Sequence, residues 1–410
     1  MFRLKRISDQ LIARAADFRH VRKFTELLGA ERVIVLLKGA RGIGKTTALL
    51  QHLHTKQNQG LKCLFVSADS VLVDGLNLFD IAERFADEGG QVLALDEVHK
   101  KEGWDQSLKS IFDSLPNLKV IASGSSSLQI TKADLSRRAL SINCYGLSFC
   151  EWLNIRHDLH LKTATLDEIL NHHEEISQTV IEALRPIKVA VIEAFKSYLR
   201  EGYFPTSLEL ESWVYQETIR ESVRKTIEQD ILACYPELSG RSIQRLKKCL
   251  AIMAEKCPYT PDINDLTAAL DLSDQKTTKQ YLFYLHEARL IREVAKAGKT
   301  ISALAKAEKI YLDNTNYLYS LCRDDPDQGT VRETFMANVL SIYSEMNQLS
   351  DLQVPKKGDF LTADGHLFEV GGRSKTLSQL AGAKMGWVAA DDLEFGQDRK
   401  VPLWIFGFLW

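Results

Sequence analysis

Residues 39–47, GARGIGKTT, gather bare backbone amides and one cation in a single short loop. Glycine lets such a loop curl its N–H groups inward, so that phosphate oxygens can come close to the backbone. Gly39, Gly44, Lys45 and Thr46 meet the spacing Gly-x-x-x-x-Gly-Lys-Thr, which predicts a phosphate-binding loop for ATP. The alternative is a glycine-rich turn between a strand and a helix. The other loop residues that we expect to line the phosphates are Ala40, Arg41, Gly42, Ile43 and Thr47.

Two side chains of this loop carry chemistry of their own. We expect the Lys45 ammonium to reach the β- and γ-phosphates and to act in catalysis. The Thr46 hydroxyl is an expected ligand of Mg²⁺. The helical stretch that follows, TTALLQHLHTKQ, directs its positive end at the same place.

Two adjacent acids, Asp96 and Glu97, follow an apolar run within QVLALDEVHK, residues 91–100. A buried strand that ends there brings both acids to the edge at which open α/β sheets bind ligands. We expect Asp96 to hold Mg²⁺ through water and Glu97 to polarise the attacking water, because ATP hydrolysis needs both roles. The alternative is a strand end that simply leads to solvent.

Serines follow the next apolar run, in LKVIASGSSS at residues 118–127. We expect this strand to lie beside the strand that ends at Asp96. Ser123 and Ser125 would then lie near the γ-phosphate and sense whether it is present, so Ser123 joins the catalytic candidates. The alternative is a serine-rich turn.

Short apolar runs alternate with helical stretches through the first part of the chain. This alternation predicts an α/β fold whose parallel sheet carries helices on both faces. The expected strands are residues 33–37, 63–70, 92–95, 118–127 and 140–148, and the expected helices include 76–88 and 107–114.

Length and composition limit the classes of function. The 410 residues suffice for two or three domains, and 45% hydrophobic with 26% charged residues is typical of a globular protein. The formal net charge of −2 provides no global basic field for nucleic acid, so such contacts need a local patch. The seven cysteines are scattered singly, which favours neither zinc knuckles nor a disulfide framework. No signal peptide or membrane-spanning run is evident, so we expect a cytoplasmic protein without a membrane partner.

The order of these motifs resembles the AAA-type ATPases of the archaeal-ATPase kind. The resemblance rests on GARGIGKTT, LALDEVH followed by Trp104, ASGSSS, an arginine at Arg138, then LSFCEWL and YLREGYFP. The family shows Gly-Arg, Pro-Leu-Ser-Phe-x-Glu and Tyr-Leu-x-x-Gly-Gly-Phe-Pro. Here Arg137 replaces the first glycine, Gly146 replaces the proline, and Tyr203 replaces the second glycine of the last motif.

The resemblance implies an AAA-like core over residues 1–153 and a helical lid over residues 154–240. It also implies a homo-oligomer in which Arg138 acts as an arginine finger on a neighbour's nucleotide. The alternative for Arg138 is a structural surface arginine. Within the helical region, His172 and His173 beside two glutamates raise the question of a metal site, but a solvated helix face is the favoured interpretation.

Residues 259–300 show two short helical stretches, a turn and an apolar run, which predicts a winged helix within residues 241–300. Its second helix offers Gln275, Lys276, Thr278, Lys279 and Gln280 to DNA. The alternative is a module that packs on a protein partner of unknown identity.

The remaining residues, 301–410, resemble a restriction-endonuclease-like α/β fold. Such nucleases use an Asp and then Glu-x-Lys, which Asp359 and Glu369 satisfy, with Glu333 as a supporting acid. The lysine position is Gly371, and Lys375 lies four residues later, where we do not expect it to substitute. We therefore expect a retained fold without nuclease activity.

Together these features predict a Mg²⁺-dependent ATPase. Three roles remain open: a remodelling ATPase, a nucleotide switch, or an ATP-regulated DNA-binding protein or nuclease in a defence or mobile-element context. The missing lysine counts against the nuclease.

Overall fold

The computed structural model describes residues 2–18, 20–124, 135, 137–298 and 307–410, so the predicted role of Ser125 lies outside the described residues. The chain forms two compact units, Met1–Tyr145 and Gly146–Trp410, which are taken in turn. The division falls earlier than the boundary expected after residue 153.

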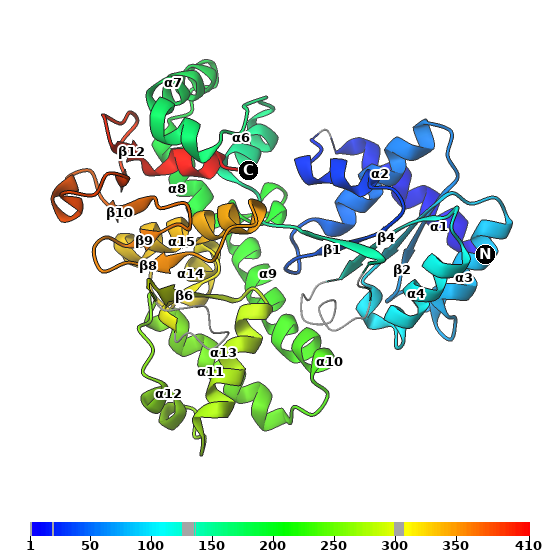
Figure 1. The fold of residues 1–410 in the computed structure, drawn as a ribbon. Coiled ribbons are helices and arrows are strands. Elements are labelled where there is room, and N and C mark those ends of the chain that lie inside the picture. The colour runs from blue at the N-terminus through cyan, green and yellow to red at the C-terminus, as the bar shows by residue number, and fades with distance from the viewer. Residues whose placement is uncertain (1, 19, 125–134, 136, 299–306) are drawn as a thin grey trace. The chain divides into compact units, whose positions relative to one another are not determined.

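The first unit alternates strands and helices as the sequence predicts (Figure 1). Its strands are β1 (Ile34–Lys38), β2 (Cys63–Ser67), β3 (Val92–Asp96), β4 (Lys119–Gly124) and β5 (Ala139–Asn143). Its described α-helices are α1 (Phe2–Arg14), α2 (Lys45–Asn58), α3 (Leu78–Asp87) and α4 (Trp104–Ser114).

The five strands form one parallel sheet in the order β2-β3-β4-β1-β5. In the register of β3 and β4, Leu95 pairs with Ala122, so Asp96 and Ser123 end neighbouring strands side by side. Successive residues of a strand point to opposite faces, so these two share the face of Ala94 and Ile121. The adjacency of β3 and β4 that the sequence predicts is therefore present.

Helices cover both faces of this sheet, which confirms the predicted fold class. On one face, alternate strand residues such as Leu36 and Leu95 pack in a single core with Phe85 of α3 and Leu108 of α4. On the other face, α2 contacts β2, β3 and β4. The strand residues are almost all buried, as expected for a sheet that is covered on both sides.

The second unit begins with helices and ends with a mixed sheet. Its larger helices are α6 (Phe149–His157), α7 (Leu166–Leu184), α8 (Val191–Glu201), α9 (Ser212–Lys225), α11 (Gly240–Glu255), α12 (Ile263–Ala269), α13 (Gln275–Glu287), α14 (Thr315–Leu321) and α15 (Gln328–Met346), with the short α10 (Leu232–Cys234) between α9 and α11. Its strands are β6 (Ile291–Lys296), β7 (Ala307–Leu312), β8 (Gln353–Val354), β9 (Phe360–Leu361), β10 (Leu367–Gly371), β11 (Gly386–Ala390) and β12 (Lys400–Pro402).

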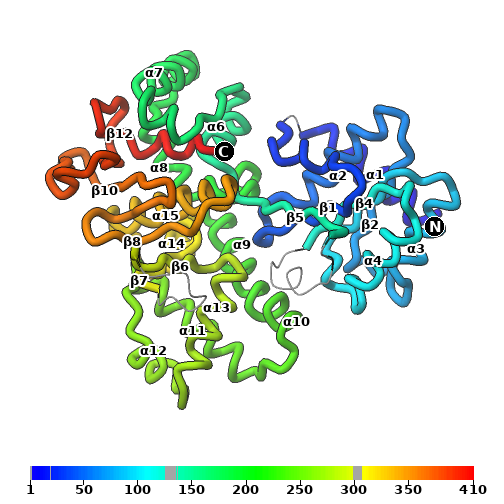
Figure 2. Tube along the Cα trace, in the orientation of Figure 1, coloured from blue at the N-terminus to red at the C-terminus, as the bar shows by residue number. Residues whose placement is uncertain are grey.

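One seven-stranded sheet joins the predicted winged helix to the predicted nuclease-like region (Figure 2). The strand order is β12-β11-β10-β9-β8-β6-β7, and β6 pairs antiparallel with β7 and parallel with β8. The boundary expected between residues 300 and 301 falls between the paired strands β6 and β7. The two predicted modules therefore share a sheet and are not separated at that point.

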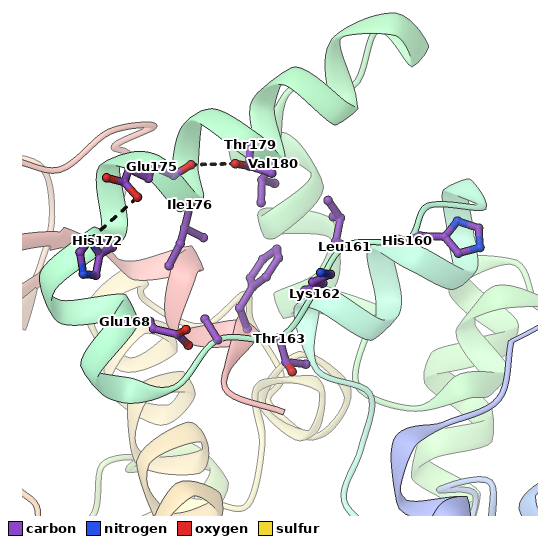
Figure 3. A pocket seen from close by; sticks show the side chains of 12 residues that line it. His160, Leu161, Lys162, Thr163, Glu168, His172, Glu175, Ile176, Thr179 and Val180 are labelled. Carbon is purple, nitrogen blue, oxygen red and sulfur yellow. Dashed lines mark hydrogen bonds and ion pairs between the residues drawn. The ribbon is translucent and has the colours of Figure 1, made fainter.

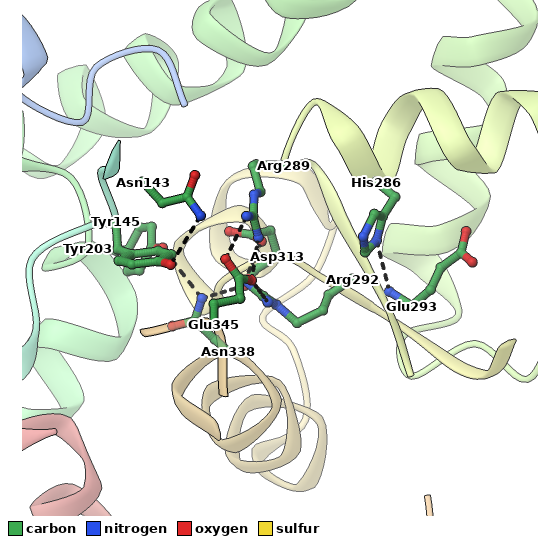
Figure 4. A network of polar contacts seen from close by, with 10 residues as sticks. All are labelled: Asn143, Tyr145, Tyr203, His286, Arg289, Arg292, Glu293, Asp313, Asn338 and Glu345. Carbon is green, nitrogen blue, oxygen red and sulfur yellow. Dashed lines mark hydrogen bonds and ion pairs between the residues drawn. The ribbon is translucent and has the colours of Figure 1, made fainter. Parts of the chain in front are cut away.

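A buried polar network also ties these modules together (Figure 4). Arg292 of β6 binds Asp313 at 2.8 Å and Glu345 of α15 at 3.2 Å, and Arg289 binds the same glutamate at 2.7 Å. Arg292 and Asp313 are almost fully buried, so removal of either partner would leave an uncompensated charge in the interior. This cost opposes separation of β6 from α14 and α15.

The two family-like motifs of the second unit meet in space. Ser148 caps α6 and forms a reciprocal capping box with Glu151, which explains the Ser-Phe-x-Glu pattern. The Tyr198 hydroxyl of YLREGYFP donates to the Leu147 carbonyl at 2.8 Å. A side chain at Gly146 would come within 2.5 Å of the Tyr203 ring. These motifs therefore build one packed junction between α6 and α8.

Candidate functional site

The loop between β1 and α2 has the backbone geometry that its glycines predict. Gly42 and Gly44 have φ angles of 80° and 95°, in the left-handed region that favours glycine. A Cβ at Gly39 would lie 2.5 Å from the Cys144 carbonyl oxygen, so the start of the loop also requires glycine. Helix α2 begins at Lys45, directly after the loop, and points its free N–H groups toward it.

The Lys45 side chain folds back onto this loop. Its ammonium donates to the Gly39 carbonyl at 2.9 Å and to the Ala40 carbonyl at 3.0 Å, and the residue is buried. The lysine therefore places its charge inside the curl of the loop, where it favours anionic oxygens. A further cation is tied to the loop: Arg22 Nη1 donates to the Ile43 carbonyl at 3.1 Å. The sequence analysis did not identify Arg22, because no local motif marks it.

The predicted magnesium ligands lie together. The Thr46 hydroxyl donates to Asp96 Oδ2 at 2.7 Å, which joins the first turn of α2 to the end of β3. Both supply oxygen donors of the kind Mg²⁺ prefers, and Mg²⁺ usually keeps several waters. The described residues contain no group of three or more His, Cys, Asp or Glu side chains suited to a metal. The pair thus fits a largely hydrated Mg²⁺ bound by one hydroxyl and one carboxylate.

Ser123 connects the two acids. Its hydroxyl donates to Asp96 Oδ1 and accepts the Glu97 backbone N–H at 3.2 Å, and the residue is fully buried. Those contacts orient both the carboxylate of Asp96 and the backbone at Glu97. The structure therefore gives Ser123 a positioning role in addition to the phosphate-sensing role predicted from its place on β4.

Glu97 lies at the turn that follows β3. Its φ angle of 53° is left-handed, so the chain turns sharply there and enters the 3₁₀ helix Val98–Lys100. The Glu97 side chain is about one-fifth exposed, and its Oε2 lies 3.4 Å from Nε2 of His99. No motif in the sequence marks His99, although it lies within QVLALDEVHK at residues 91–100.

Arg138 lies at the amino ends of the strands, at the opposite end of β1 from the phosphate-binding loop. Its carbonyl accepts the Ile34 N–H, at the amino end of β1, whereas the loop follows the carboxyl end. Five strand residues at about 3.3 Å each place roughly 16 Å between these two ends of β1, so Arg138 lies far from the loop of its own subunit. Its guanidinium is held by Asp113 at 2.9 and 3.1 Å. A role on a neighbour's nucleotide requires this pair to open and stays a prediction.

In the second unit, the predicted nuclease acids do converge, with one unexpected partner. Lys375 lies over Gly371, within 2.9 Å of where a side chain there would begin, and its ammonium is 2.5 Å from Glu369 Oε1. Lys375 thus contacts Glu369 although it lies four residues beyond the motif position, and the expectation that it does not substitute in catalysis stays a prediction. The turn after β10 brings the Lys375 side chain back into the space that the missing side chain of Gly371 leaves open.

Each of these acids already has an internal partner. Asp359 Oδ2 accepts the Val370 N–H at 2.8 Å, and Glu333 accepts from Lys309 and from the Tyr311 hydroxyl, both at 2.9 Å. Burial raises the pKa of Asp359 to about 6, and the carboxylates of Glu333 and Glu369 add to this effect. Below about pH 6 this carboxyl therefore holds a proton, and its neutral form is a poor cation ligand.

The predicted recognition helix, α13, presents a narrow polar face. Gln275, Lys276, Lys279 and Gln280 are exposed, in agreement with the prediction. Thr278 is not available to DNA, because it is fully buried and bonds the Thr267 hydroxyl at 2.7 Å. Asp262 and Asp274 cap α12 and α13, so acids border this face.

The two adjacent histidines of α7 differ in environment. His172 is exposed, as expected, but His173 is buried and its Nε2 lies 3.0 Å from the Asp398 carbonyl. The prediction of a solvated face is therefore wrong for His173, which packs against the segment before β12. A cavity of about 690 Å³ lies beside α7 (Figure 3), lined by polar residues such as His172 and Glu175 and by apolar Ile176, Val180 and Phe408.

Residues 31–153 match a family model described as an AAA domain, and residues 192–328 match a domain of unknown function. The uncharacterized protein MJ1637 of Methanocaldococcus jannaschii is 24% identical over 393 residues, which cover 90% of this chain and 82% of that protein. Among solved structures, AMPPCP-bound DnaA from Aquifex aeolicus has a TM-score of 0.27 at 15% identity, covering 65% of this chain and 85% of that chain. PCH-2 of C. elegans has a TM-score of 0.24 at 16% identity, covering 68% of each chain.

The match to the AAA domain model agrees with the sheet and loop described above and supports a P-loop ATPase-like core over residues 31–153. The predicted winged-helix and nuclease-like character of the second unit stays a prediction. Among the described residues, no helix is long and apolar enough to cross a membrane.

Proposed function

We propose that this chain binds ATP together with Mg²⁺ and hydrolyses the ATP at the carboxyl ends of β1 and β3 in the five-stranded sheet. The observation that carries the proposal is the hydrogen bond from Thr46 to Asp96. It joins two motifs that are 50 residues apart in the sequence and presents their oxygens beside the Lys45 loop. Phosphate binding, metal binding and an acid for water activation are thereby supported at one place.

Each residue has a distinct part in this proposal. The loop amides and Lys45 bind the phosphate oxygens, and Thr46 and Asp96 hold Mg²⁺. Bound Mg²⁺ neutralises charge on the phosphates. Ser123 fixes the direction of Asp96, and Glu97 accepts the proton of the attacking water. Glu97 suits this role because its side chain is partly exposed at the same edge, whereas Asp96 is buried.

Two substitutions separate binding from chemistry. Lys45→Ala removes one charge-assisted contact, worth roughly 1.5–3 kcal/mol, so ATP affinity should fall about tenfold to a hundredfold. Glu97→Gln keeps size and hydrogen bonding but removes the base, so ATP should still bind while turnover falls about a hundredfold. Calorimetry measures the first effect and phosphate release the second. Lys109→Ala, at a partly exposed position of α4 away from the loop, is the matched control for loss of a lysine.

Equal ATP affinity of the wild type and Lys45→Ala would rule out the loop assignment. Full turnover by Glu97→Gln would place water activation elsewhere. Two roles then remain for such a site: a remodelling ATPase or a nucleotide switch. The turnover number distinguishes them, since a switch retains its nucleotide and turns over slowly.

We also propose that α13 contributes to DNA binding in the second unit. Exposed Lys276 and Lys279 lie one helical turn apart and can both contact the DNA backbone. Gln275 and Gln280 lie on either side of them, and they would have to release their bonds to Asn264 and Tyr284 to reach base edges. A homo-oligomer in which Arg138 serves a neighbouring nucleotide is a further proposal, supported by the position of Arg138 on the AAA domain.

A further inference from the structure

His99 is a buried histidine placed directly against the proposed catalytic acid. Its side chain is about 1% exposed, whereas that of Glu97 is 21% exposed. The atoms Nε2 of His99 and Oε2 of Glu97 are 3.4 Å apart. Histidine is seldom buried beside a carboxylate unless the contact is useful, because the imidazole must lose its hydration.

The backbone between the two residues holds them in this relation. Glu97 is left-handed, and Val98–Lys100 forms a single 3₁₀ turn in which the Lys100 N–H bonds the Glu97 carbonyl at 2.9 Å. Val98 is fully buried in the core between them. The turn therefore places the backbone of His99 next to Glu97, and the burial of the His99 side chain restricts its movement.

We propose that His99 is a positioning residue that orients the Glu97 carboxylate for activation of water. An ionised carboxylate only accepts hydrogen bonds, so Nε2 of His99 carries the hydrogen in this contact. The separation is longer than a normal hydrogen bond, which limits rotation of the carboxylate without holding it tightly. The contact with His99 thus sets the direction of the Glu97 carboxylate and leaves it able to accept a proton.

This inference rests on the proposed ATPase function and adds a residue to it. Ser123 fixes the backbone of Glu97, but three rotatable side-chain bonds separate the backbone from the carboxylate. His99 acts at the far end of that side chain. Ser123 therefore positions the backbone of Glu97, and His99 positions its carboxylate.

Three substitutions test the role of the Nε2 atom. Glutamine places its amide nitrogen at about the reach of Nε2, whereas asparagine is one bond shorter and matches Nδ1. We expect His99→Ala and His99→Asn to lower kcat for ATP hydrolysis by about tenfold to a hundredfold, with the KM for ATP unchanged. We expect His99→Gln to recover most of the rate. His54→Ala, at a partly exposed histidine of α2, is the matched control.

A double substitution ties the effect to Glu97. If His99 acts through Glu97, the variant Glu97→Gln/His99→Ala should turn over no more slowly than Glu97→Gln alone. If the two losses multiply instead, His99 acts by another route and the inference is wrong. Wild-type kcat in a folded His99→Ala protein would also overturn it. If His99→Ala fails to fold, the Gln and Asn variants decide, and equal rates for those two would overturn the inference.

The same experiments separate this inference from the proposed function. Full activity in Glu97→Gln would contradict the function itself, whatever His99 does. Loss of activity in Glu97→Gln with full activity in His99→Ala would contradict only the role of His99. Circular dichroism and ATP calorimetry on every variant show that fold and binding are retained.

Discussion

Substitution of Asp359 by asparagine should stabilise this protein in neutral and alkaline solution but not in acid. Burial, with Glu333 and Glu369 nearby, raises the pKa of Asp359 to about 6 from the ordinary value of 3.8. The folded protein therefore holds a proton there between about pH 4 and pH 6, where the unfolded chain has released it. Stability from this group is complete below pH 3.8 and is lost as the pH rises through 6.

The size of the effect follows from the shift. Two pKa units at about 1.4 kcal/mol each give close to 3 kcal/mol as an upper value, and we expect roughly 1–3 kcal/mol. Asparagine cannot ionise, but its carbonyl can still accept the Val370 N–H that Asp359 accepts at 2.8 Å. At pH 8 the variant should therefore need more energy to unfold than the wild type by this amount. At pH 3.5 this gain should be absent.

Urea unfolding of the full chain, followed by tryptophan fluorescence in EDTA, provides the assay. Five of the six tryptophans, from Trp152 onward, lie in the second unit, so the signal reports mainly on that unit. Asp351→Asn makes the same charge change at an exposed position and should show no such pH dependence. Equal stability of wild type and Asp359→Asn at pH 8, or the same gain at both pH values, would refute the reasoning.

Three other predictions concern surfaces and activities. Arg138→Ala should keep ATP binding but lose turnover by ~10³ if the residue serves a neighbouring subunit. Asp113→Asn weakens the ion pair that holds Arg138 and should keep full turnover. Wild-type activity in Arg138→Ala would leave only a structural role for the arginine. Purified protein should not nick supercoiled, linear or single-stranded DNA with Mg²⁺ or Mn²⁺, with or without ATP; nicking that disappears in Asp359→Ala would contradict this. Replacement of both Lys276 and Lys279 by alanine should weaken duplex DNA binding and reduce its salt dependence by about two phosphate contacts, measured by fluorescence anisotropy.

The sequence predicts the geometry of the phosphate-binding loop because its motif has a fixed local conformation. The spacing from Gly39 to Thr46 specifies a loop whose glycines adopt left-handed φ angles, and the structure has them. The contact from Thr46 to Asp96 followed from one further rule, that parallel strands present their carboxyl ends at one edge. The pairing of β3 with β4 placed Ser123 beside Asp96 in the same way.

Other contacts depend on turns that no sequence pattern specifies. His99 reaches Glu97 only because Glu97 is left-handed and a single 3₁₀ turn follows. Lys375 reaches Glu369 because the chain folds back after β10 and Gly371 leaves room for its side chain. His173 is buried by a segment more than 200 residues away, which helical periodicity within α7 cannot reveal.

The contact between Gly146 and Tyr203 changes how the two unusual positions of this chain should be understood. Each appears in the sequence as a separate departure from a family pattern, yet the ring of Tyr203 fills the space that a side chain at 146 would need. With Tyr203 in place, a side chain at position 146 would collide with the tyrosine ring, so the residue at each of these positions limits the residue at the other. We expect positions 146 and 203 to vary together among homologues, although they are 57 residues apart in the sequence. A motif search that scores the two positions independently would therefore pass over chains like this one.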